Sequence, residues 1–280
     1  MGLFFNYDKP GKGVDKDAPK KKGFFLFFEL LWRKLGKLFQ VNMLYFLVSL
    51  PILLLYHFVF FSVLAGVLPV ETETDSVLLQ HTALYVTAVF AILWGTGPIS
   101  CGHAFILRNF AREEHVFLTS DFFEKIKENF KHGIIIFLID IVALVLGLNA
   151  IIFYWSMAKN GSNLGLYMAF MVAIFMMIYT YMHFYIYQFS VTFENKLRAI
   201  YKNSLIMAFA TLPMNLLLTV MVAVFTYFAF CMFTPIAIIL LCFLFWISLM
   251  RFMIDFYTAR VIKRKLIVAE EATENEESEE

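Results

Sequence analysis

The chain carries no charged residue from Ser204 to Met250. A helix rises ~1.5 Å per residue, so roughly 20 apolar residues cross the ~30 Å hydrocarbon core of a bilayer. The uncharged segment is too long for one crossing and suits two, joined by a tight turn around Phe230–Pro235. Thr234 and Pro235 are typical of a helix cap and a first helical turn. This segment predicts a protein that spans a membrane.

Four further apolar stretches predict an all-α, polytopic membrane helix bundle with six transmembrane helices. Hydrophobic residues make up 61% of the chain and charged residues 16%, whereas soluble domains have roughly 45–50% and 25%. This difference excludes a water-soluble globular domain. The predicted spans are Met43–Val67, Ala83–Leu107, Gly133–Trp155, Leu164–Tyr187, Leu205–Tyr227 and Ile236–Asp255.

The basic residues indicate which span ends face the cytoplasm, because cytoplasmic loops carry an excess of Lys and Arg. Of the 23 Lys and Arg, Lys159 alone falls in a loop on the opposite side. The loop between the first two spans instead carries Glu71, Glu73 and Asp75. We therefore expect both termini in the cytoplasm. The other basic residues lie in four segments: the N-terminus to Lys37, Arg108–Lys131, Lys196–Lys202 and Arg251–Lys265.

The sequence predicts three regions. Residues 1–22 are expected to be a flexible cytoplasmic N-terminus and residues 269–280 an acidic, disordered tail, because such compositions bury too little apolar surface to fold. Residues 23–268 form the predicted transmembrane domain. Apolar residues recur at helical spacing in Phe24–Phe39 and Phe122–Phe130, with basic residues between them. This pattern predicts cytoplasmic amphipathic helices that lie in the membrane surface.

Three cytoplasmic stretches resemble one another, starting at Lys34-Leu35, Lys125-Ile126 and Lys196-Leu197. Each precedes an odd-numbered span, and Ser49-Leu50-Pro51 aligns with Thr211-Leu212-Pro213. We therefore predict three repeated units, each an interfacial helix followed by a helix hairpin. Chance similarity among apolar sequences is the competing explanation.

Asp140 is the main candidate for a functional residue within a span. An ionisable group inside a bilayer is unfavourable and is by default a functional hypothesis. In the proposed repeat Asp140 aligns with Ser49 and Thr211, so these three could converge in the bundle interior as a small polar or proton-accepting site. The alternative is that Asp140 is protonated, or bonded to a neighbouring helix, and stabilises packing.

Two further features concern the helix backbone and its ends. Gly95, Gly97 and Pro98 interrupt the second predicted span and form a candidate helix break, of the kind that exposes backbone groups to substrate in transporters. A plain kink that lets helices approach closely is the alternative. Arg251 and Asp255 are four residues apart, share a helix face and form a candidate structural ion pair.

Motifs for catalysis or metal binding are missing from the sequence. There is no HExxH, GxSxG, P-loop or Rossmann glycine pattern. His103 and His183 lie in similar contexts near cytoplasmic span ends, but two histidines do not make a metal site. The three cysteines show no CxxC spacing. We therefore expect no enzymatic activity, no metal, no cofactor and no nucleic-acid partner.

Several short motifs carry a resemblance that covers most of the chain. They are Phe4-Phe5-Asn6-Tyr7 with Pro10-Gly11-Lys12-Gly13, then Leu50-Pro51, Gly97-Pro98, Asp121-Phe122-Phe123, Lys127-Glu128-Asn129-Phe130-Lys131, Phe193-Glu194-Asn195 and Leu212-Pro213. In order and spacing they resemble the YesL-like family of bacterial integral membrane proteins, whose function is not established. The resemblance implies a Gram-positive-type bacterial plasma membrane and an association with sugar ABC transporter components. It implies no catalytic or binding residues.

The leading hypothesis is therefore a non-enzymatic accessory or scaffold protein associated with carbohydrate uptake, with the lipid bilayer and ABC transporter components as partners. The alternative is a small-solute transporter or channel with a polar site near Asp140. A water-accessible cavity at Asp140 would favour transport, and a dry, packed interior would favour the scaffold. A lipid-modifying enzyme is a third hypothesis and would need polar side chains that converge around His103, His183 and Arg108.

Overall fold

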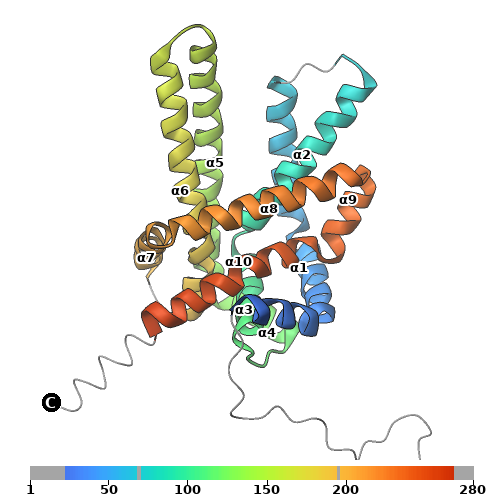
Figure 1. The fold of residues 1–280 in the computed structure, drawn as a ribbon, viewed down its shortest axis with the longest axis vertical. Coiled ribbons are helices and arrows are strands. Elements are labelled where there is room, and N and C mark those ends of the chain that lie inside the picture. Colours follow the sequence, from blue (N-terminus) through green and yellow to red (C-terminus); the bar gives the residue numbers. More distant parts are fainter. Residues whose placement is uncertain (1–22, 68–70, 194–195, 268–280) are drawn as a thin grey trace, which may run out of the picture.

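The structure is a computed structural model that describes residues 23–67, 71–193 and 196–267. Within these ranges every regular element is a helix, and six helical segments are long and apolar enough to cross a membrane (Figure 1). This confirms the predicted fold class. The expectations for residues 1–22 and 269–280 lie outside the described residues. The spans are α1 (Gly23–Val67), α2 (Glu73–Leu93), α5 (Phe130–Lys159), α6 (Asn163–Thr192), α8 (Leu212–Met232) and the segment Pro235–Leu266.

The predicted interfacial helix Phe24–Phe39 and the first span form one continuous helix, α1. At ~1.5 Å per residue its 45 residues extend about 67 Å, well beyond the hydrocarbon thickness. In Figure 1 the dark-blue first turns lie across one end of the bundle, near α3 (Pro98–Arg112) and α4 (Leu118–Glu128), and the lighter turns rise beside α2. The amphipathic and spanning parts are therefore joined without a break.

The second span lies earlier in the chain than the predicted Ala83–Leu107. A capping box starts α2: Thr72 Oγ1 accepts from the Asp75 backbone N–H, and the Asp75 carboxylate accepts from the Thr72 backbone N–H. Two such reciprocal bonds satisfy N–H groups that a helix start leaves free. The helix ends at Leu93, and the residues from Pro98 onward form α3, a separate helix that packs against α4 and α10 (Ile247–Ile262). The predicted bounds were wrong because they counted the residues on both sides of the candidate helix break as one span.

The uncharged segment from Ser204 forms two crossings, as predicted, but the first begins later than Leu205. Helix α7 (Leu197–Ala210) ends before Thr211, and α8 follows it at an angle (Figure 1). The expected cap at the next turn is confirmed, because Thr234 Oγ1 accepts from the Ala237 N–H. The last crossing consists of α9 (Pro235–Leu241), the π-helix η1 (Cys242–Trp246), α10 and a second π-helix, η2 (Lys263–Ile267).

The helix boundaries differ among the three proposed repeat units. Lys34 lies inside α1, Lys125 lies near the end of α4, and Lys196 directly precedes α7. The first unit has no interruption between its interfacial and spanning parts, whereas the other two are interrupted at Asn129 and Thr211. The repeat therefore stays a prediction.

The core lies where α1, α2, α3, α6 and α10 meet, and the far ends of α5 and α6 project beyond it (Figure 1). These projecting helices expose large apolar side chains, among them Leu146 (65% exposed) and Phe153 (61%). Apolar surface of this extent is stable against hydrocarbon and not against water. A set of buried polar side chains, among them His183, Arg251 and Asp255, lies instead in the core.

Candidate functional site

The break between α2 and α3 is built on two glycines in the left-handed backbone region. Gly95 has φ of 82° and Gly97 has φ of 63°. A Cβ atom on Gly97 would lie 2.8 Å from Phe137 Cβ, and one on Gly95 would lie 2.4 Å from Ser100 Oγ. Residues with a side chain would meet both backbone strain and a clash. The sequence therefore has a specific reason for glycine at both positions.

Protein side chains satisfy the backbone groups that the break frees. Residues 94–98 are all buried, so an unpaired N–H or C=O here would be strongly unfavourable. Three of these backbone groups are hydrogen-bonded to protein side chains, so the break does not present them to a substrate. The bonds are Tyr56 Oη to Gly95 O (3.1 Å), Gly97 N to Tyr187 Oη (3.2 Å) and Thr96 N to Ser100 Oγ (2.7 Å).

Asp140 on α5 is completely buried and bonds to two side chains of α6. Its Oδ1 accepts from Tyr179 Oη at 2.7 Å and lies 2.9 Å from His183 Nε2. Its Oδ2 has no hydrogen-bond partner among the described residues. The Trp94 ring stacks on the His183 imidazole at 5.1 Å with an interplanar angle of 10°. The carboxyl group is thus held by α6 and closed off by the residue that ends α2.

Both ring nitrogens of His183 face oxygen atoms. Nε2 faces Asp140 Oδ1, and Nδ1 lies 3.1 Å from the Tyr179 carbonyl oxygen, which can only accept. Both contacts are hydrogen bonds when the pair is an imidazolium with a carboxylate, or an Nδ1-protonated imidazole with a carboxylic acid. In either arrangement the pair has no net charge. This neutrality explains how a carboxyl group without Lys or Arg in its own span is accommodated.

Arg251 on α10 joins three spans. Its Nε lies 3.2 Å from Asp255 Oδ1, which places the predicted partners in contact, and both residues are buried. Its terminal nitrogens donate to the carbonyl oxygens of Ile92 (3.1 Å) and His183 (3.2 Å). The carbonyl groups at the end of α2 have no partner within that helix, and a cation there is favourable. Arg251 thus caps α2 and holds it beside α6.

Asn42 on α1 supports the π-helix of the last span. Its Nδ2 donates to the carbonyl oxygens of Cys242 and Phe243, each at 2.7 Å. Its Oδ1 accepts from the Ser248 N–H at 2.7 Å. A π-helix displaces backbone groups from the normal helical pattern, and one amide side chain here satisfies three of them. Asn42 is completely buried.

His103 on α3 lies beside this support. Its Nε2 is 2.7 Å from Ser248 Oγ, and its ring stacks on Tyr45 at 4.1 Å. Burial, and to a smaller extent the positive charge of Arg251, lower the pKa of His103 to about 3. The imidazole is therefore neutral at physiological pH. His103 and His183 each bind within the core, and no group of three metal-ligating side chains occurs in the described residues.

Ser49 and Thr211 lie apart from the Asp140 contacts. Ser49 Oγ donates to the Tyr45 carbonyl oxygen of its own helix (2.6 Å), and Thr211 Oγ1 donates to the Met207 carbonyl oxygen (2.7 Å). Among the described residues no hydrogen bond joins Asp140 to either of them. The three residues therefore do not form one hydrogen-bonded site: Ser49 bonds to its own helix, and Thr211 bonds to the backbone of α7 and to Tyr185 of α6. Arg108 likewise bonds at the end of α6, away from both histidines.

Most partners of Asp140, Arg251 and Asn42 were not predicted from the sequence. Tyr179 and His183 are four residues apart and share a face of α6, but nothing in the sequence links that face to α5. Asn42 was not among the site residues predicted from the sequence. Like Asp140, Asn42 is a polar residue in an apolar span. Such a residue needs a hydrogen-bond partner, so its position alone indicates a contact with another helix.

No family model, curated protein or solved structure matches this chain.

Proposed function

We propose that this chain is a non-enzymatic accessory or scaffold protein of a bacterial plasma membrane that assists carbohydrate uptake. Both termini lie in the cytoplasm in this proposal. The burial of the polar side chains in the core supports the scaffold part. The resemblance to the YesL-like family supports the carbohydrate part, and the distribution of Lys and Arg supports the orientation.

The observation that carries the proposal is the burial of the polar core. Asp140, Ser49 and Asp255 are 0% exposed, and Thr96 in the helix break is also 0% exposed. A transporter in an open state would give water a route to such groups. Here aromatic rings and helix backbones surround them, and each group bonds to another part of the chain, although the Oδ2 atoms of Asp140 and Asp255 have no partner among the described residues. Such a core holds helices in fixed positions.

Purification from native membranes tests the scaffold role. The tagged chain is extracted in mild detergent beside a tagged, unrelated six-span protein, and the bound proteins are quantified by mass spectrometry. We expect a permease or solute-binding component of a sugar ABC transporter in about equal molar amount, recovered with this chain alone. Recovery of no such component would contradict the proposal, and so would sugar uptake by liposomes that contain the purified chain alone.

Cysteine labelling tests the orientation. In a chain without its three native cysteines, Lys159→Cys and Lys127→Cys place one thiol in the α5–α6 loop and one on α4. A membrane-impermeant maleimide applied to intact cells should label the first position and label the second only after the cells are lysed. The reverse pattern would place the termini outside.

A small-solute transporter or channel is the second candidate, and one observation favours it. The Oδ2 atom of Asp140 lacks a partner among the described residues, and the carboxyl group lies beside a broken helix. A proton that moves between Asp140 and His183 would change neither the fold nor the net charge. The purified chain in liposomes, tested for proton-linked solute flux with Asp140→Asn as the control, decides this candidate. Flux that Asp140→Asn abolishes would support it and contradict the scaffold.

A further inference from the structure

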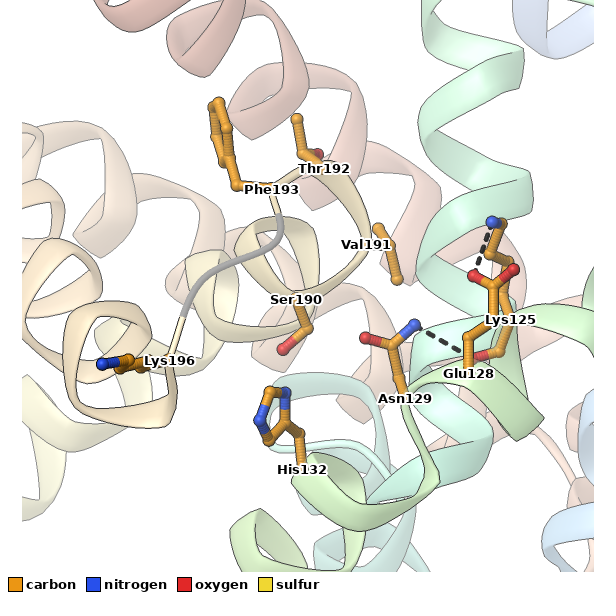
Figure 2. A pocket seen from close by; sticks show the side chains of 9 residues that line it. All are labelled: Lys125, Glu128, Asn129, His132, Ser190, Val191, Thr192, Phe193 and Lys196. Carbon is orange, nitrogen blue, oxygen red and sulfur yellow. Dashed lines mark hydrogen bonds and ion pairs between the residues drawn. The ribbon is translucent and has the colours of Figure 1, made fainter.

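A pocket of about 590 Å³ lies at the end of α6, between the α4–α5 junction and the start of α7 (Figure 2). It is separate from the Asp140 network. Since α5 begins and α6 ends here, the pocket lies at the level where the spans leave the hydrocarbon, on the face expected to be cytoplasmic. Its lining residues are Lys125, Glu128, Asn129, His132, Ser190, Val191, Thr192, Phe193 and Lys196.

Ser190 supplies a buried hydroxyl group without a partner. The residue is 8% exposed, and its Oγ makes no hydrogen bond to any described residue. Figure 2 shows this oxygen directed into the space beside His132. Most buried polar side-chain atoms in proteins are hydrogen-bonded, so an unpaired hydroxyl in a pocket wall indicates a ligand group at that position.

The N-terminus of α7 lies at the same pocket, and no side chain among the described residues caps it. Lys196 is the N-cap residue, and it makes no capping bond to the helix. The first N–H groups of a helix carry partial positive charge, so a lysine is an unfavourable neighbour for them. An anion at this helix end would interact favourably with its free N–H groups. Figure 2 draws the Lys196 side chain directed away from Ser190, so its ammonium group reaches such an anion by rotation of the flexible side chain. The 14 residues of α7 form a helix long enough for this effect.

Arg108 holds two of the lining residues in place, and Lys125 forms part of the wall. Arg108 donates to the Val191 carbonyl oxygen at 2.7 Å and to Thr192 Oγ1 at 3.0 Å. Because Thr192 Oγ1 accepts that bond, its own hydrogen is available as a donor. Lys125 pairs with Glu128 at 2.6 Å, so this lysine and this glutamate balance each other. The remaining charge among the described lining residues is the positive charge of Lys196.

We propose that this pocket binds the phosphate group of an anionic ligand. Ser190 Oγ and the N–H groups that start α7 donate to the phosphate oxygens, and Lys196 neutralises their charge. The phosphate belongs to the headgroup of an anionic lipid, which the depth of the pocket at the membrane surface suits, or to a free anion from the cytoplasm. Both sources share this chemistry, and the experiment separates them.

Isothermal titration calorimetry on the full chain in a neutral detergent tests the site with two probes. One is inorganic phosphate, and the other is dihexanoyl-phosphatidylglycerol, with dihexanoyl-phosphatidylcholine as the neutral control. The site variants are Lys196→Gln and Ser190→Ala. Lys127→Gln removes an exposed charge from α4 outside the pocket, and Ser204→Ala removes another buried, unpartnered hydroxyl group.

We expect saturable binding of at least one anionic probe and weaker binding of the neutral lipid. Loss of one hydrogen bond to a charged group should weaken that binding about tenfold or more in Lys196→Gln and in Ser190→Ala. Lys127→Gln and Ser204→Ala should retain the wild-type affinity. Binding of inorganic phosphate identifies a free anion as the ligand, and binding of phosphatidylglycerol alone identifies a lipid. Absence of saturable binding overturns the site, as does a tenfold loss in Lys127→Gln or an unchanged affinity in either site variant.

Discussion

His183 Nε2 lies 2.9 Å from Asp140 Oδ1, and both side chains are completely buried between α5 and α6. Because the second ring nitrogen faces a carbonyl oxygen, the imidazole has a hydrogen-bond partner on both sides and holds the carboxyl group between α5 and α6. The effects of substituting the two residues on the stability of the protein are therefore coupled. Replacing one alone leaves a buried polar group without its partner, whereas replacing both removes the requirement.

His183→Ala is expected to lower the free energy of unfolding by about 3 kcal/mol. It leaves the buried Asp140 carboxyl group without its hydrogen bond to the imidazole. Asp140→Asn alone should lower it by about 1 kcal/mol, because an amide can still accept from Tyr179. The double variant should be more stable than the sum of the two losses predicts. Denaturant titration in mixed micelles measures the wild type, the two single variants and the double variant. Strictly additive losses would contradict a direct interaction between Asp140 and His183.

Gly97→Ala should destabilise the protein by about 2 kcal/mol or more. The added Cβ would lie 2.8 Å from Phe137 Cβ, and alanine is strained at φ of 63°. Gly36→Ala in α1 is the matched control, because nothing lies within 4 Å of its added Cβ. Alanine in a helix interior is favoured over glycine by up to about 1 kcal/mol, so this control should gain stability. Equal melting temperatures for the two variants would contradict the account of the break.

Asn42→Ala should lower the free energy of unfolding by about 2–3 kcal/mol, since three backbone groups of the last span lose their partner. Asn149→Ala is the control. Asn149 is exposed on α5, and its Nδ2 donates to the Val145 carbonyl oxygen of its own helix at 2.8 Å. That substitution should change stability by less than about 0.5 kcal/mol. A similar loss in both variants, measured in the same denaturant titration, would show that Asn42 does not support the π-helix.

Acid should destabilise the protein partly through His103. Its pKa is about 3 in the folded chain and lies near 6.5 in the unfolded chain, so below pH 6.5 the unfolded state binds the extra proton. The contribution of His103 to stability is thus complete above that pH. It falls by about 1.4 kcal/mol per pH unit as the pH drops toward 3. His103→Gln should have a shallower decline between roughly pH 7 and pH 5 in thermal melts. Parallel curves for the variant and the wild type would contradict the assignment.

The apolar runs were sufficient to predict six spans and the turn at Thr234, because both are properties of local sequence. The glycines and the proline after the second span were recognised as a candidate helix break, but the start of the fifth span was not predictable in the same way. Thr211 looks like an ordinary span residue in the sequence. In the structure α7 ends just before it, and its hydroxyl group bonds to Tyr185 of α6. A boundary that depends on tertiary contacts leaves no local signal.

The site residues show the same limit. Asp140 attracted attention because a carboxyl group in a span needs a partner. Its partner could not be identified, because His183 and Tyr179 lie on a different helix with no charge to mark them. The contact between Arg251 and Asp255 depends only on their spacing along one helix, which is why the sequence could suggest it.

The guanidinium group of Arg251 binds the α2 and α6 backbones at the same time. An axial shift of α10 by one residue, about 1.5 Å, would break these bonds together, and so would its rotation about its own axis. The relative register of these three spans is therefore fixed. The far ends of α5 and α6 carry no such constraint, and they stand clear of α8 and α10 in Figure 1. One side chain thus ties three spans together at a single level of the bundle, and the projecting ends of α5 and α6 lie beyond that point of attachment.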